Sequence, residues 1–71
     1  MDELLYMFEY EHRPVETHYL YKPFYDMAHH IVNALPLNRE RSVALRKLLE
    51  SKDAAVRCVI YKDRLKTFTP K

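Results

Sequence analysis

The aromatic residues of this chain gather near its beginning. Seven of its nine Phe and Tyr residues fall within the first 25 positions: Tyr6, Phe8, Tyr10, Tyr19, Tyr21, Phe24 and Tyr25. Aromatic rings can stack on nucleotide bases while neighbouring Lys and Arg side chains bind phosphates. In a small helical protein the same residues also anchor cores and interfaces. The cluster therefore leaves two roles open, ligand stacking and packing.

Charge is distributed unevenly along the chain. Residues 1–36 contain two basic and six acidic residues, whereas residues 37–71 contain ten basic and four acidic ones. The halves could pair across subunits, the basic half could bind an anion, or both could be solvated faces. On a helical projection, four arginines of the basic half share one flank: Arg39, Arg46, Arg57 and Arg64.

Metal binding and catalysis find little support in the sequence. No two of the four histidines have the i, i+4 spacing of a helical zinc pair, and Cys58 is the only cysteine. The chain contains no Gly-rich phosphate loop and no serine or cysteine beside a recognisable base. We therefore expect a binding protein without a metal or cofactor, not an enzyme.

The size of the chain predicts one domain that needs support. Its 71 residues are too few for two domains, and a core this small is marginal without disulfides, metals or association. With a lone cysteine, association is the remaining means. The absence of glycine favours an all-α fold, because tight β-hairpin turns prefer it. No long apolar run or signal-like start is present, which predicts a cytoplasmic protein and no membrane partner.

Two helical stripes predict an antiparallel hairpin within the single domain 1–71. The second helix is expected over 38–62, with Asn38 as its N-cap after Pro36. The first is expected over 17–35, starting either near Thr17 with a kink at Pro23 or near Lys22 with Pro23 in its first turn. An irregular segment, 1–16, should lie across the hairpin or a neighbour, and 63–71 forms a tail.

Lys52 projects into the apolar stripe of the second helix. A buried lysine needs a partner, so its ammonium should meet an acid, a ligand or the edge of another subunit. Alternatively its stem crosses the apolar surface and its ammonium stays in water.

The segment Leu35-Pro36-Leu37-Asn38-Arg39-Glu40-Arg41-Ser42-Val43-Ala44-Leu45, continued by Glu50-Ser51-Lys52-Asp53-Ala54-Ala55-Val56-Arg57, resembles a family of small phage proteins. These are the anti-CBASS sponges, which sequester the cyclic nucleotides that signal infection in bacteria. The match is strong over 35–57 and weaker back to Phe8. Leu49 and Ser51 depart from the family motif, in which Glu and Ala are common at these positions.

The resemblance implies an all-α homo-oligomer, a hexamer in many members, that holds cyclic dinucleotides or cyclic trinucleotides between subunits. It implies that Tyr10 stacks on a base and Lys22 contacts a phosphate, and it places Lys52 and Arg57 within the matching motif. Two alternatives stay open: a helical inhibitor that docks on a host protein through its aromatic N-terminus, and non-specific DNA or RNA binding, which the modest net charge of +2 disfavours.

Overall fold

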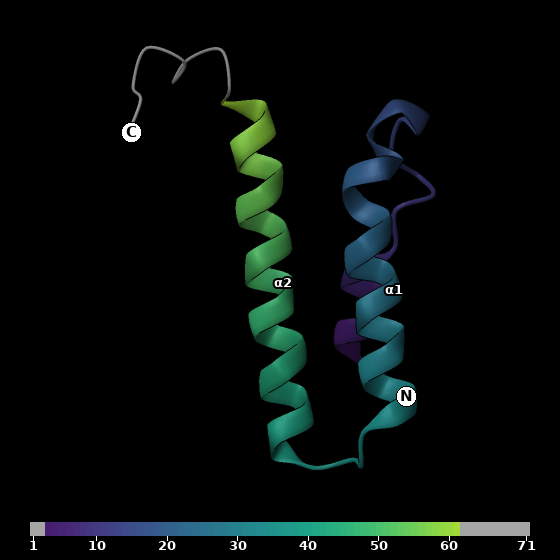
Figure 1. The fold of residues 1–71 in the computed structure, drawn as a ribbon, viewed down its shortest axis with the longest axis vertical. Helices are drawn as coiled ribbons and strands as arrows, with labels where there is room; N and C mark the ends of the chain where they lie inside the picture. Colours follow the sequence, from purple (N-terminus) through teal and green to yellow (C-terminus); the bar gives the residue numbers. More distant parts are fainter. Residues whose placement is uncertain (1–2, 62–71) are drawn as a thin grey trace.

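The computed structural model describes residues 3–61 as a helical hairpin with a short N-terminal layer. Its elements are the 3-10 helices η1 (Glu3–Phe8) and η2 (Val15–Thr17), followed by the α-helices α1 (His18–Ala34) and α2 (Arg39–Ile60). The two α-helices run antiparallel, and η1 lies behind α1 in the view of Figure 1. The all-α hairpin predicted from the sequence is confirmed. The predicted tail, 63–71, and Arg64 within it lie outside the described residues.

The turn between the helices is fixed by residues that cap both of them. The Asn38 side chain accepts a 3.0 Å hydrogen bond from the Arg41 backbone N–H, which confirms the predicted N-cap of α2. The Arg41 guanidinium in turn donates to the Val32 carbonyl at 3.0 Å and to the Leu35 carbonyl at 3.5 Å. Because these carbonyls lie at the end of α1, one arginine joins the end of one helix to the start of the next.

Helix α1 begins early and continues through Pro23. Its first residue is His18, directly after η2, and Pro23 lies inside it. The structure thus agrees with a start near Thr17 and not with a start near Lys22. At Thr17 both the backbone N–H and the hydroxyl donate to the Pro14 carbonyl, at 2.9 and 2.6 Å. These bonds make η2 a short lead-in to the helix.

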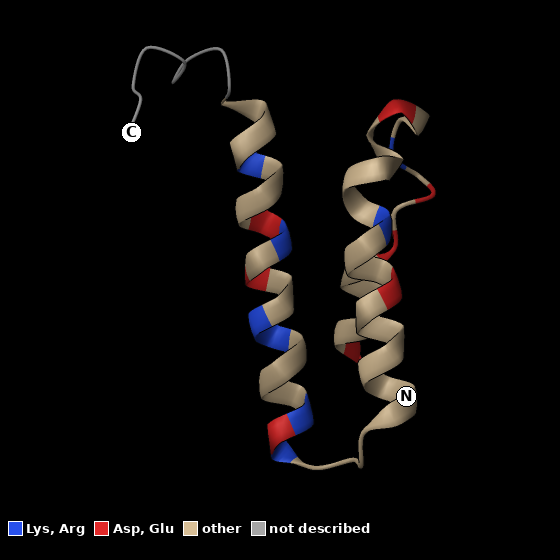
Figure 2. Ribbon diagram, in the orientation of Figure 1, with Lys and Arg blue, Asp and Glu red and all other residues tan. Residues whose placement is uncertain are grey.

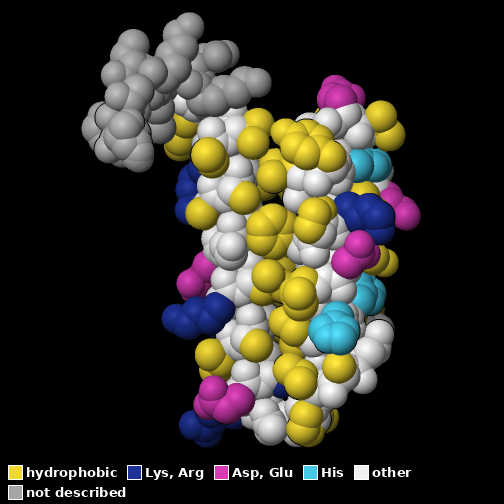
Figure 3. Space-filling view, in the orientation of Figure 1, with side chains coloured by type: hydrophobic (Ala, Val, Ile, Leu, Met, Phe, Trp, Pro, Cys, Tyr) yellow, Lys and Arg dark blue, Asp and Glu magenta, His cyan; other side chains and the backbone are white. Residues whose placement is uncertain are grey.

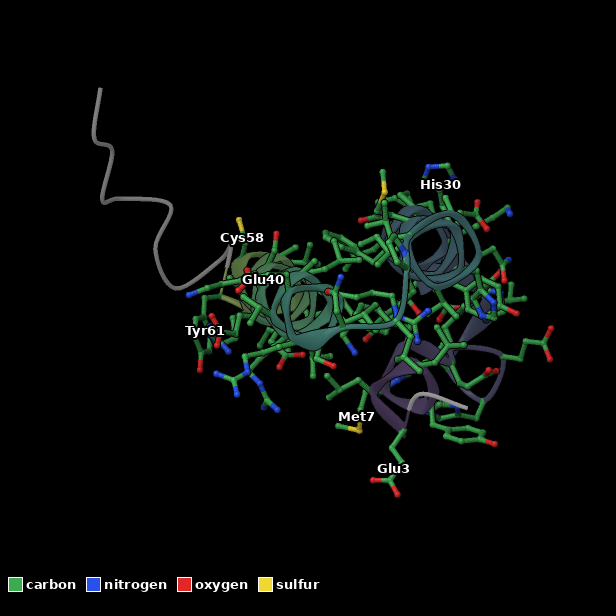
Figure 4. All side chains as sticks on the ribbon, turned by 90° about the horizontal axis from the view of Figure 1, so that it is seen from below. Glu3, Met7, His30, Glu40, Cys58 and Tyr61 are labelled. Atoms are coloured by element: carbon green, nitrogen blue, oxygen red, sulfur yellow. The ribbon has the colours of Figure 1, made fainter. Side chains whose placement is uncertain are left out.

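The core lies where η1, α1 and α2 meet. Phe8, Ala28 and Leu45 are almost completely buried, and Leu5 is also buried. Leu5 and Phe8 are three residues apart, so they share one side of a 3-10 helix, which has three residues per turn. Seen end-on, η1 covers one broad side of the hairpin with Glu3 and Met7 on its outer surface, while His30 lies on the opposite side (Figure 4).

Lys52 is the buried cation of this core. Its side chain is 7% exposed, and its ammonium donates a 2.8 Å hydrogen bond to the Met7 carbonyl. Asp53 Oδ1 lies 3.7 Å away, and the rings of Phe8 and Tyr21 lie 5.7 and 6.0 Å from the ammonium. The main partner is therefore a main-chain carbonyl of the N-terminal segment, supplemented by the neighbouring acid, so the ammonium is not left in water.

The side of the hairpin opposite η1 has no covering layer among the described residues. In Figure 3, which views this side, hydrophobic side chains follow the seam between α1 and α2. Helix α1 contributes exposed Met27, and Phe24, Ile31 and Leu48 are only half-buried. The hairpin alone thus leaves part of its apolar stripes in contact with water.

Charged side chains are also segregated. Basic residues are spread along the length of α2, while α1 carries few charges (Figure 2). Within the described residues no helix combines the length and apolar character needed to cross a membrane.

Candidate ligand-binding sites

Tyr10 is held by a group of aromatic rings on the side of α1. Its ring makes edge-on contacts with His18 and Tyr25, at centroid separations of 4.8 and 5.3 Å. The Tyr25 ring continues the group to His29 at 4.2 Å. Tyr25 lies seven residues after His18 and four before His29, so the three residues share one face of α1. The half-buried Tyr10 ring is therefore packed in one orientation while part of it stays accessible.

Lys22 lies on the same face of α1 and is solvent-exposed. Its ammonium forms an ion pair with Asp26 one turn later, at 3.0 Å. The hydrogen bond that the Lys22 ammonium donates to Asp26 and the negative charge of that carboxylate raise the pKa of Lys22. Desolvation opposes this effect, and the nearby Tyr10 and Tyr25 raise the pKa further. Lys22 is therefore a cation at every physiological pH.

Tyr10 and Lys22 consequently belong to one surface, which we call the tyrosine edge and define as Tyr10, His18, Lys22, Tyr25 and His29. The Tyr10 ring contacts His18 and Tyr25, which lie four residues before and three residues after Lys22 on the same face of α1. An aromatic ring beside a cation offers one group for a base and one for a phosphate. Asp26 competes for the cation, because a phosphate would have to share or displace it.

Lys52 and Arg57, the other two predicted site residues, lie at a different place. They line a hollow of about 210 Å³ together with Arg13, Tyr21, Asp53 and Val56. The Arg13 guanidinium lies over the Tyr21 ring, 5.3 Å from its centroid. We call this site the arginine hollow. It brings the N-terminal segment, the start of α1 and the second half of α2 together around three basic side chains.

A well-ordered loop connects the two sites. The Arg13 N–H donates to the Tyr10 carbonyl at 2.8 Å, and the Arg13 carbonyl lies 2.9 Å from His18 Nε2. These two bonds fix the backbone from Tyr10 to Arg13 against the first turn of α1. The same few residues therefore present Tyr10 at the tyrosine edge and Arg13 at the arginine hollow.

Sequence reasoning missed Arg13 and Tyr21 as site residues. Arg13 was included only in the irregular segment 1–16, and Tyr21 appeared only as one aromatic residue among seven. Their pairing depends on how the loop folds back on α1, for which spacing gives no direct signal. The only hint was composition, since Arg13 is one of just two basic residues in the first half of the chain.

Comparison of this chain with protein-family models, with curated proteins and with solved structures finds no match. The resemblance noted over residues 35–57 accordingly remains a prediction that depends on the quoted motif.

Proposed function

We propose that this protein is a non-catalytic binding protein that sequesters cyclic dinucleotides or cyclic trinucleotides between copies of itself. The observation that carries the proposal is the tyrosine edge, where the Tyr10 ring packs on the face of α1 that also carries the exposed cation Lys22. The motif resemblance over 35–57 points to the same ligand class. In the cell, such a protein would block antiphage signalling by removing the messenger.

The symmetry of the ligand matches a site to which two subunits contribute the same residues. A cyclic dinucleotide has two bases and two phosphates related by a near two-fold axis. Two subunits related by a two-fold axis could each offer one Tyr10 and one Lys22 to the two halves of the ligand. Sequestration needs capture and slow release rather than turnover, so a site made of one ring and one cation is sufficient.

The uncovered side of the hairpin supports association. Its half-buried residues, such as Phe24, Ile31 and Leu48, would lose contact with water if a second copy covered them. The basic surface of α2 could also meet the acidic residues of a neighbouring N-terminal segment. We therefore propose a homo-oligomer, with a hexamer as the expected state.

Calorimetry with a panel of cyclic dinucleotides and cyclic trinucleotides tests the ligand class. Submicromolar binding to at least one member of the panel is the expected result, and no heat of binding across the whole panel would refute the proposal. Light scattering on the same sample measures the number of subunits. A monomer that binds no cyclic nucleotide would refute both the proposed ligand class and the proposed oligomer.

Three variants test the tyrosine edge. Tyr10→Ala should weaken binding about five- to hundredfold because the stacked base loses its ring. Lys22→Gln should weaken it by a similar factor, while the control Lys47→Gln, an exposed lysine of α2, should leave affinity unchanged. If Tyr10→Ala and Lys22→Gln both bind like the wild type while the oligomer is intact, the ligand does not occupy this edge.

A second candidate is docking on a host protein through the N-terminal segment. The feature that favours it is the exposure of Tyr6 and Met7, which are 62% and 55% exposed. Tyrosine and methionine are both common in protein interfaces. This candidate predicts no binding to any cyclic nucleotide, so the calorimetric panel separates the two.

A further inference from the structure

We propose that the arginine hollow is a second, independent binding site, and that it takes the phosphoryl group of a phosphomonoester or of inorganic phosphate. This inference goes beyond the proposed function and does not depend on it. None of the residues that line the hollow belongs to the tyrosine edge.

The charge of the hollow matches a dianion. Arg13, Lys52 and Arg57 contribute +3 and Asp53 contributes −1, which leaves +2. A phosphomonoester carries about −1.5 to −2 at neutral pH. Asp53 disfavours an anion, but its carboxylate lies 3.7 Å from the Lys52 ammonium and so already has a cation beside it. The two arginines are therefore the excess charge.

The donors at the rim of the hollow are available. Arg13 and Arg57 are exposed, and neither guanidinium has a hydrogen-bond or carboxylate partner within residues 3–61. Arg13 instead lies over the Tyr21 ring, a contact that orients its planar fork without using its N–H groups. Guanidinium forks suit phosphate oxygens because they can donate two parallel hydrogen bonds.

The base of the hollow adds a third, buried cation. Lys52 is held by the Met7 carbonyl, which uses one of the three donors of its ammonium. Because the ammonium is withdrawn from water, its attraction for an anion in the hollow is screened less than that of a surface lysine. The charge at the base thus strengthens what the rim arginines supply.

The size of the hollow limits the ligand. Its volume of about 210 Å³ is below the roughly 300–1,000 Å³ of sites for drug-sized molecules. Tyr21 is 7% exposed and already faces Arg13, so its ring is not free to stack on a base. The hollow should therefore recognise the phosphoryl group alone, whatever it is attached to.

The site is also preorganised. The backbone of Arg13 is anchored by the Tyr10 carbonyl and by His18, and the following turn is closed by the hydrogen bonds between Thr17 and Pro14. Little backbone entropy remains to be lost when an anion binds, which favours affinity.

The test is a calorimetric titration of the protein with inorganic phosphate, AMP and adenosine, each in a buffer that contains no other phosphate. We expect phosphate and AMP to bind with affinities within a few-fold of each other and adenosine not to bind. If neither phosphate nor AMP binds, the proposal is wrong. If AMP binds and phosphate does not, recognition of the phosphoryl group alone is refuted.

Variants then locate the site. Arg13→Gln and Arg57→Gln should each weaken phosphate binding about tenfold or more, because each removes charge-assisted hydrogen bonds from an exposed side chain. Arg46→Gln removes the same charge from an exposed arginine of α2 that does not line the hollow. Equal weakening by Arg46→Gln would show non-specific attraction and overturn the proposal.

Failure of the phosphate site can be distinguished from failure of the proposed cyclic-nucleotide site. Tyr10→Ala should leave phosphate binding intact, and Arg13→Gln should leave the affinity for cyclic dinucleotides intact. Loss of both kinds of binding in either variant, with an unchanged circular dichroism spectrum, would mean that the two sites are one and would refute their independence.

Discussion

The ammonium of Lys52 donates a 2.8 Å hydrogen bond to the carbonyl of Met7, 45 positions earlier in the chain. The bond joins the middle of α2 to η1, the layer that covers one side of the hairpin. It gives a buried charge a fixed partner and at the same time satisfies the carbonyl. This contact connects the N-terminal segment to the rest of the fold more specifically than apolar packing does.

Lys52→Ala should therefore lower the free energy of unfolding by about 1–3 kcal/mol, because the Met7 carbonyl loses its partner and the side chain leaves a gap. Urea denaturation at one fixed protein concentration measures the change. The control Lys47→Ala alters an exposed lysine of the same helix and should cost under about 0.5 kcal/mol. Equal effects of the two variants would mean that the contact with Met7 adds nothing to stability.

Asn38→Ala should destabilise the hairpin by about 1 kcal/mol, since the Arg41 backbone N–H loses the side-chain oxygen that caps α2. Thermal unfolding followed by circular dichroism reports it as a lower midpoint. Asn33→Ala makes the same replacement at an exposed position within α1 and should be neutral or slightly stabilising, because alanine is the better helix former. A cap that does not matter would leave the two midpoints equal.

Ala28→Leu should destabilise the protein by about 1–3 kcal/mol. Ala28 is completely buried beside Phe8 and Leu45, where a larger side chain would force the elements apart. Ala34→Leu adds the same volume at an exposed site near the end of α1 and serves as the control. Denaturant titration of both variants separates overpacking from a change in helix propensity, and the interpretation fails if Ala28→Leu is as stable as Ala34→Leu.

Ligand binding at the tyrosine edge should depend on pH only at the alkaline end. The pKa of Lys22 is raised above 10.5, chiefly by its hydrogen bond to Asp26, so its charge is complete below that value and is lost as pH rises past the folded pKa. The affinity for a cyclic dinucleotide should thus be level from neutral pH to about pH 10 and fall as the Lys22 ammonium loses its proton at higher pH.

Lys22→Arg isolates this effect, because arginine stays charged throughout the alkaline range. The part of the alkaline loss that Lys22 causes should disappear in the variant. An identical pH profile for the variant and the wild type would mean that Lys22 does not cause the loss.

Local features of this fold were predictable from the sequence. Asn38 lies three positions before the N–H that it caps and two positions after Pro36, so both signals come from residues close in the sequence. The apolar spacing around Leu45 likewise identified the buried stripe of α2. Both rest on helix geometry, which fixes the relation between residues three and four apart.

Features that join distant segments were not predictable in the same way. The stripe placed Lys52 among apolar residues but left open whether its ammonium would be buried or in water. It could not identify Met7 as the partner, since no spacing rule connects residues so far apart. The arginine hollow could not be predicted for the same reason. Its residues Arg13, Tyr21 and Arg57 come together only when the loop before η2 folds back on α1. For η1, the three-residue separation of Leu5 and Phe8 was a usable signal, although a segment this short has too few residues to establish a period.

The covering layer η1 also limits how copies of this chain can associate. With Leu5 and Phe8 packed against one broad side, the apolar seam between α1 and α2 is open to a neighbour on the opposite side (Figure 3). A hairpin exposed on both sides could add partners at each and grow into an open-ended stack. If copies of this chain associate through the uncovered seam, a covering layer on the other side stops such growth, so η1 would favour an assembly that closes on itself over a fibre.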